Sequence, residues 1–232
     1  MLLRLTPEGQ RLVRVRIDNI PAALKAGVAK AGAHPKVVLD ATHGWYRAAD
    51  ALAEAGAEAH LAHPLGVKMF TYRRVKTKDK EAADLTDLLR MGLPPEAWIA
   101  PPRVREIREL VRYRQKLVNA RTSAKTQVHA VLARVCPHVP VTDLFGRAGR
   151  DWLAGLSLHG PYRARVASLM RLIAFLDGET SGIEKLTAQS LAADPGYRAV
   201  QTIAGVGPVF VAVMVAEIGD VTRFASPGQL CS

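Results

Sequence analysis

The stretch KVVLDATHGWYRAADALAEAGAEAHLAH, residues 36–63, decides the fold class. Its first part, KVVLDAT, is a short apolar run that ends in an acid, which predicts a buried central strand. The middle part, WYRAADALAEAG, has a helical pattern, and AEAHLAH predicts a second short strand. This alternation of strand and helix favours an α/β fold with a mixed sheet.

The flanking segments extend the same pattern. LLRLTPEGQRLVRVRI predicts a β-hairpin with its turn at TPEG, and IPAALKAGVAKAG predicts a helix. PLGVKMF opens another helix. VKTKDKEAADLTDLLRMG, residues 75–92, predicts a helix with Thr77 as its N-cap, an apolar stripe of Ala82, Leu85 and Leu89, and Gly92 just past its end.

The second half changes character. Arg103 to Cys136 contains no Pro or Gly and predicts one long helix. Apolar residues recur every seven positions in two series, which favours a coiled coil: Val104, Val111, Val118 and Leu132, with Lys125 interrupting, and Leu110, Leu117, Ala124 and Val131. A second long helix is expected from Tyr162 to Ala193, with a possible break at Gly178 or Gly182, so the pair predicts a helical hairpin.

The charge points to a polyanionic partner. The net charge of the 232 residues is +11, and 49% of them are hydrophobic, so we expect a globular protein that binds nucleic acid. Residues 66–136 hold 16 Lys and Arg against 7 Asp and Glu, a net of +9. The alternative is that these charges form only a solvated face. The candidate DNA-binding residues are Arg73, Arg74, Lys76, Arg112, Arg114 and Arg121.

Other classes are disfavoured. Two distant cysteines make neither a disulfide framework nor a zinc site and suit a reducing cytoplasm. No run of 18 apolar residues predicts a membrane span, and the first ten residues do not resemble a signal peptide. His60 and His63 lie three apart in a predicted strand, on opposite faces, which argues against a metal pair.

The tail, IAGVGPVFVAVMVAEIGD, predicts a tight turn between two helices. Gly205 and Gly207 form the turn, and Pro208 opens the second helix. Free backbone N–H groups at such a turn can hold a phosphate, as in a helix-hairpin-helix DNA-binding element. Spacing alone leaves open an ordinary turn between packed helices.

Three segments in colinear order resemble the bacterial insertion-sequence transposases of the IS-one-ten type. They are VVLDATHGWYRAADALAEAGAEAHLAHPLGVK, RRVKTKDKEAADLTDLLRMG and FASPGQLCS. The resemblance implies a ribonuclease-H/resolvase-like domain with an acidic tetrad, then a coiled coil, then a transposase domain with a nucleophilic serine. It also implies Mg²⁺ at the tetrad, and DNA and a structured guide RNA as partners.

Carried over residue by residue, the resemblance gives this chain two catalytic and metal-binding candidates. Asp40 stands where the family usually has Glu, and Glu81 where it has the second of two helix acids. Lys78 replaces the first of these acids and inverts its charge. A lone Asp40 could also simply cap the following helix.

We therefore expect a resolvase-like domain over residues 1–100 without its first strand, long coiled-coil helices over 101–190, and a partial transposase domain over 191–232. The expected protein is a truncated transposase that binds nucleic acid, self-associates, works in the bacterial cytoplasm at the nucleoid and lacks catalysis. Two alternatives remain: a magnesium-dependent structure-selective nuclease, and a non-catalytic nucleic-acid-binding or dimerisation module.

Overall fold

The computed structural model describes residues 1–70, 78–136 and 138–231. The chain divides into two compact units, residues 1–99 and 100–232. Each unit is described by itself below. The first is a mixed α/β unit, and the described part of the second contains helices without strands.

The first unit begins with the predicted hairpin. Strands β1 (Leu2–Leu5) and β2 (Arg11–Val15) pair antiparallel. Gly9, in the turn between them, has a φ of 90°, a backbone conformation that glycine adopts without steric cost. Helix α1 (Pro21–Ala29) follows, with Pro in its first turn.

The strand–helix–strand prediction for residues 36–63 is confirmed. Strand β3 (Lys36–Asp40) pairs parallel with β4 (Glu58–Ala62), and α2 (Trp45–Glu54) connects them. The short β5 (Glu96–Ala97) pairs antiparallel with β4, so the sheet is mixed, as predicted. The ribonuclease-H-like form of this sheet stays a prediction.

The place of β3 within the sheet was predicted wrongly. The strand order is β3-β4-β5, so β4 is the central strand and β3 lies at an edge of this sheet. Leu61 and Ala62 of β4 are buried, whereas β3 is exposed at both ends. Both β3 and β4 are short apolar runs, so their sequences do not show which strand pairs on both sides and is therefore central.

Two more helices complete the first unit. Helix α3 (Pro64–Phe70) has no buried residue, and α4 (Lys78–Arg90) packs against β3 and β1. Leu85 of the predicted stripe is buried on α4, but its buried neighbour is Leu88 rather than Leu89. Gly92, with a φ of 72°, follows the end of the helix, as predicted. Thr77, the predicted N-cap, lies outside the described residues.

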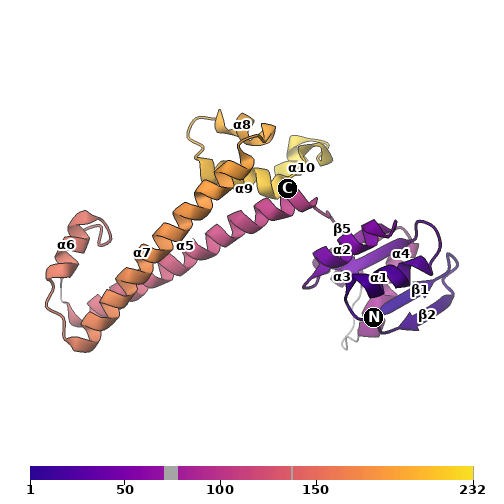
Figure 1. Cartoon of the computed structure of the whole chain (residues 1–232), viewed down its shortest axis with the longest axis horizontal. Helices are drawn as coiled ribbons and strands as arrows, with labels where there is room; N and C mark the ends of the chain where they lie inside the picture. Colours follow the sequence, from indigo (N-terminus) through magenta and orange to yellow (C-terminus); the bar gives the residue numbers. More distant parts are fainter. Residues whose placement is uncertain (71–77, 137, 232) are drawn as a thin grey trace. The chain divides into compact units, whose positions relative to one another are not determined.

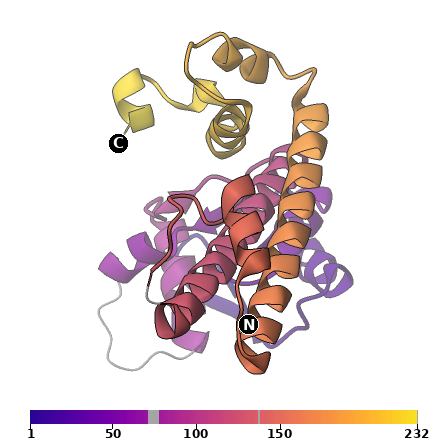
Figure 2. The ribbon, with the colours of Figure 1, turned by 90° about the vertical axis from the view of Figure 1, so that its left-hand side faces the viewer.

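The second unit is built on the predicted helical hairpin. Helices α5 (Pro102–Val135) and α7 (Gly160–Leu191) run side by side in Figure 1 and in Figure 2. They are antiparallel, because Arg121 near the middle of α5 meets Asp177, and Arg114, one heptad earlier, meets Glu184. Helix α7 continues through Gly178 and Gly182, so neither predicted break occurs.

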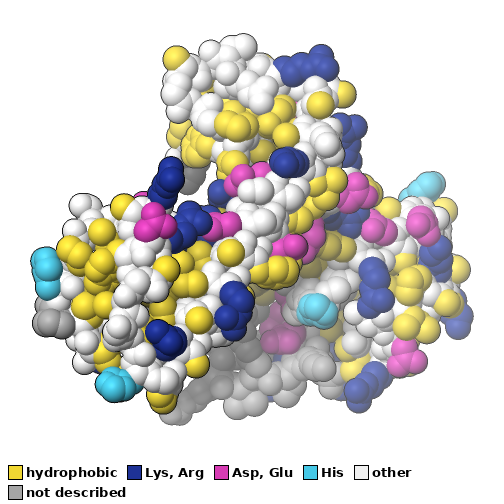
Figure 3. Space-filling view, turned by 60° about the vertical axis from the view of Figure 1, so that its left-hand side comes forward, with side chains coloured by type: hydrophobic (Ala, Val, Ile, Leu, Met, Phe, Trp, Pro, Cys, Tyr) yellow, Lys and Arg dark blue, Asp and Glu magenta, His cyan; other side chains and the backbone are white. Residues whose placement is uncertain are grey.

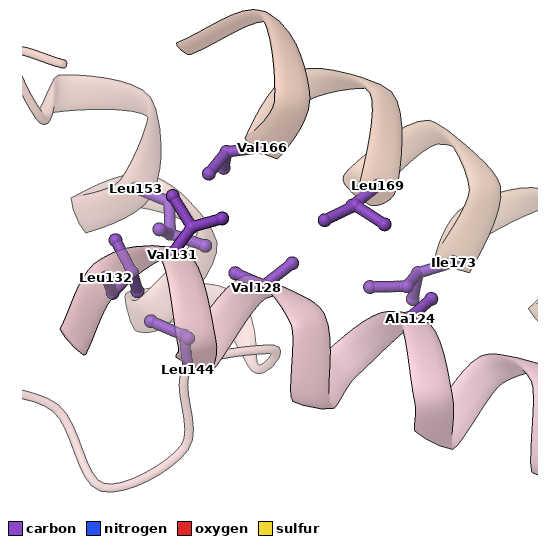
Figure 4. Close-up of a cluster of buried hydrophobic side chains, with 9 residues drawn as sticks. All are labelled: Ala124, Val128, Val131, Leu132, Leu144, Leu153, Val166, Leu169 and Ile173. Atoms are coloured by element: carbon purple, nitrogen blue, oxygen red, sulfur yellow. The ribbon is translucent and has the colours of Figure 1, made fainter. Parts of the chain in front are cut away.

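The apolar seam of α5 faces α7 of the same chain. Val128 and Val131 of α5 lie against Val166 and Leu169 of α7 in one buried cluster. Figure 4 shows that Leu153, from α6 (Arg147–Gly155), joins this cluster. Ala124, Val131 and Leu132 of the predicted series lie in this cluster, whereas Val128 belongs to neither series. The coiled coil stays a prediction.

The other end of the hairpin holds the tail. Helices α8 (Pro195–Gln201) and α9 (Pro208–Ile218) pack against the start of α5 and the end of α7. The buried cluster there consists of Ile107, Val111, Leu191, Tyr197, Val211, Ala212 and Ala216. The short η1 (Val221–Arg223) and α10 (Pro227–Cys231) follow.

Candidate functional site: a nucleic-acid interface and a carboxylate pair

Two of the arginines proposed to contact DNA lie on the seam between α5 and α7. Arg114 Nη2 is 2.8 Å from Glu184 Oε1, and Arg121 Nη1 is 2.7 Å from Asp177 Oδ1. The two arginine side chains are about three-quarters buried, at 23% and 28% exposure. Each therefore has a carboxylate partner within its own chain.

The third of these arginines binds the end of α9. Arg112 donates from Nε and Nη2 to the two carboxylate oxygens of Glu217, at 2.9 and 2.8 Å. Arg108 donates to the backbone carbonyls of Ala216 and Glu217, both at 2.8 Å. The hydrogen bond from Arg112 is the main cause that lowers the pKa of Glu217, although partial burial opposes it.

The carbonyls that Arg108 binds are among those that a helix leaves without partners at its C-terminus. A cation there is also favoured by the helix dipole. Arg108 and Arg112 therefore fasten the tail to α5, a role that sequence reasoning missed. Nothing in the sequence pattern links residues about a hundred positions apart.

The glycine turn of the tail has the predicted form. Gly205 has a φ of 84°, and Gly207, with a φ of −76°, is the N-cap of α9. Pro208 begins the helix. A Cβ at either glycine would meet no atom within 4 Å, so the backbone of the turn is open to an approaching group.

The remaining predicted DNA contacts, Arg73, Arg74 and Lys76, lie outside the described residues.

The candidate carboxylates fall on two elements that pack together. Asp40 is the last residue of β3, and Glu81 lies in the first turn of α4. Both residues are exposed.

Magnesium, which the family resemblance implies, needs several oxygen ligands and a negative site. The sequence supplies Lys78 where the family has a further acid, so the donor set combines two carboxylates with an ammonium. On this residue composition we predict weak or absent Mg²⁺ binding. Within the described part of the chain, no group of three His, Cys, Asp or Glu residues could hold a metal ion.

A polar cluster on β4 was also missed. His60 Nδ1 is 2.7 Å from Glu96 Oε1, and its Nε2 is 3.1 Å from Glu58 Oε1. The Nε2 contact lacks hydrogen-bond geometry, and the His60 side chain is only 14% exposed. Glu58 and His60 are two apart in one strand and so share a face, which is a signal that the sequence did contain.

None of the helices in the described ranges is long and apolar enough to cross a membrane.

Comparisons with known proteins agree with the resemblance found in the sequence. A family model for IS110-type transposases, described as "Transposase", matches residues 3–137. A second model, "Transposase IS116/IS110/IS902 family", matches residues 197–232.

A curated protein of Sinorhizobium fredii (strain NBRC 101917 / NGR234), named "Putative transposase y4qE", is 29% identical over 157 residues. The match covers 68% of this chain but 38% of that relative, so the chain spans less than two thirds of its length. Because the first model matches more than half of the residues, this chain belongs to the IS110 family of transposases.

Proposed function

We propose that this chain acts in insertion-sequence transposition as a protein that binds DNA together with a structured guide RNA. The observation that carries the proposal is the family match over both units, residues 3–137 and 197–232. The net charge of +11 supports a polyanionic partner. The guide RNA comes from the family resemblance alone.

The contacts to nucleic acid are divided among several surfaces in this proposal. The first turn of α9 offers backbone N–H groups to a phosphate, whereas the N–H of Val206 inside the glycine turn already donates to the Ile203 carbonyl. Arg73, Arg74 and Lys76 keep their predicted role. For Arg112, Arg114 and Arg121, the carboxylate partners favour a structural role over contact with phosphates.

Binding is tested by titrating the chain against labelled DNA duplex and structured RNA at several salt concentrations. Affinity should fall steeply as salt rises, because each neutralised phosphate releases counterions. Affinity that stays flat between low and moderate salt would contradict the proposal.

We also propose that this chain does not cleave DNA. Asp40 and Glu81 are two carboxylates, and Lys78 replaces the acid that would complete the helix pair. An ammonium one helical turn from Glu81 repels a divalent cation. The test is incubation with supercoiled DNA and Mg²⁺, followed by a search for nicks and covalent adducts.

The outcome of this test separates the proposal from the nuclease alternative. Magnesium-dependent nicking that is lost in Asp40→Ala would establish a nuclease that works from the first unit. Nicking that Asp40→Ala leaves unchanged would indicate a contaminating nuclease.

Self-association remains part of the proposal. The seam of α5 faces α7 of the same chain, so a second copy would have to use a different surface or exchange these helices. Sedimentation over a range of concentrations tests this, and a clean monomer at high concentration would remove it.

A further inference from the structure

The end of the helical hairpin is a compact region built from three elements. We define the hairpin tip as residues 122–171, which comprise the last turns of α5, the loop after it, α6 and the first turns of α7. These parts share one buried cluster, in which Leu132, Leu144, Leu153 and Val166 meet. The helices that carry the surface side chains of the tip are therefore packed against one another.

The tip is strongly basic. It contains seven Lys and Arg, two Asp and no Glu, a net charge of +5, and also three His. Figure 3 views the molecule from the side of the tip and shows Lys, Arg and His side chains on this surface among apolar ones. The middle of the hairpin differs from the tip in its charge balance. There Arg114 and Arg121 form ion pairs with Glu184 and Asp177.

Three of the seven tip cations have neutral partners. Lys125 Nζ lies 4.8 Å from the centre of the Phe145 ring, and Arg150 Nε donates to the Phe145 carbonyl at 2.8 Å. Arg165 donates to the amide oxygen of Gln127 at 3.3 Å. Such partners orient a cation and leave its charge uncompensated.

The other four tip cations are exposed. They are Arg134, Arg147, Arg163 and Arg171. Across residues 1–70, 78–136 and 138–231, no ion pair joins any of the seven tip cations to a carboxylate.

Two of these arginines occupy positions where a positive charge does not stabilise the helix that carries it. Arg147 is the first residue of α6, and Arg163 lies in the first turn of α7. The helix dipole disfavours a cation at either place. Neither helix has an acid in its first turn to offset this. Their positive charge is better explained by a partner outside the chain.

We propose that the hairpin tip binds the phosphate backbone of a nucleic-acid double helix without reading its sequence. This inference rests on the proposed function and assigns a surface to it. A double helix fits because its phosphates give a dense line of negative charge, and cations spread over three elements can contact several of them. DNA and RNA helices share this chemistry, so the experiment includes both.

The test compares two variants of the full chain with equal net charge. The tip variant carries Arg134→Gln, Arg147→Gln and Arg163→Gln. The control variant carries Arg11→Gln, Arg16→Gln and Lys68→Gln, three exposed cations of the first unit. Binding to a random-sequence DNA duplex and to an RNA hairpin is measured over a range of salt concentrations, and thermal melting checks the fold.

The expected result is a flatter salt dependence for the tip variant. The slope of log affinity against log salt should fall by about 2.7, at about 0.9 for each lost phosphate contact on DNA. The control variant should change the slope by less than about one unit, since only long-range attraction is reduced. The tip variant should melt no lower than the unmodified chain, because two of its changes remove cations from helix N-termini.

The two proposals fail in different ways. If the unmodified chain binds neither helix, the proposed function is wrong and the tip inference falls with it. If the unmodified chain binds and the tip variant keeps the same slope as the control, only the tip inference is overturned. A loss of binding to DNA alone, or to RNA alone, supports the inference and identifies which helix the tip holds.

Discussion

Arg112 and Glu217 lie 105 positions apart in the sequence and form a two-bond ion pair, with N–O distances of 2.9 and 2.8 Å. With Arg108, which binds the last carbonyls of α9, this pair joins the tail to the start of the long helix. Arg112, which the sequence predicted to contact DNA, here stabilises the packing of the second unit.

This pair predicts a pH-dependent contribution to stability. The pKa of Glu217 is lowered in the folded chain, so its carboxylate stabilises the fold above the ordinary value of 4.5. That contribution is lost as pH falls through the lowered pKa. Glu217→Gln should cost about 0.5 to 1 kcal/mol at neutral pH, since the carboxylate is 42% exposed. Denaturant unfolding at several pH values measures this.

The difference between Glu217→Gln and the unmodified chain should shrink below about pH 4.5. Glu179→Gln, a change at an exposed acid of α7, serves as the control and should leave stability within about 0.5 kcal/mol at every pH. A Glu217→Gln deficit that grows as pH falls would show that another group is responsible.

The seam arginines give a second prediction. Arg121→Ala removes the pair with Asp177 and should cost about 1 kcal/mol of unfolding free energy. It should leave the salt slope of nucleic-acid binding unchanged, because the guanidinium is turned toward α7. A slope that falls by about one unit would instead place Arg121 on a phosphate, as the sequence suggested. Titration over a range of salt concentrations decides between them.

The limits of sequence reasoning are visible in these same residues. The long helix was predicted to within one residue at each end, because residues 103–136 contain no Pro or Gly and apolar residues there repeat every seven positions. The repeat shows that a seam exists but does not name its partner, so the sequence predicted both a hairpin of the two long helices and self-association through the same residues. The partners of Arg112 and Arg114 depend on tertiary packing across 105 and 70 positions, which no local pattern records.

The hydrophobic cluster at the tip gives a third prediction. Leu132 is 1% exposed, and Leu132→Ala should cost about 2 to 5 kcal/mol, because a cavity opens between α5 and the loop that carries Leu144. Leu172→Ala on the outer side of α7, where the side chain is 45% exposed, should cost far less. Equal losses in thermal unfolding would contradict the packing described for the tip.

A fourth prediction concerns the carboxylate pair. Lys78→Asp should strengthen Mg²⁺ binding measured by calorimetry, because it restores an acid three positions before Glu81 on the same helix. Lys80→Asp makes the same change of charge at the position before Glu81, which lies about 100° away from it round the helix, and should have a smaller effect. Equal gains in the two variants would mean that general electrostatics, and not a site, attracts the cation. Neither variant is expected to transfer DNA strands.

The two turn glycines separate a conformational role from a binding role. Gly205 has a φ of 84°, where any other residue is strained, so Gly205→Ala should cost about 1 kcal/mol of stability. Gly207 has a φ of −76°, and a Cβ there meets nothing within 4 Å. Gly207→Ala should therefore cost only a few tenths of a kcal/mol, as a poorer N-cap.

If a phosphate approaches the backbone of this turn, the added methyl group of Gly207→Ala stands in its path. Affinity for a DNA duplex should then fall, while thermal unfolding hardly changes. Binding measured at low salt, with Gly196→Ala at the start of α8 as the comparison, tests this. Unchanged affinity in Gly207→Ala would leave the segment as an ordinary turn between two packed helices.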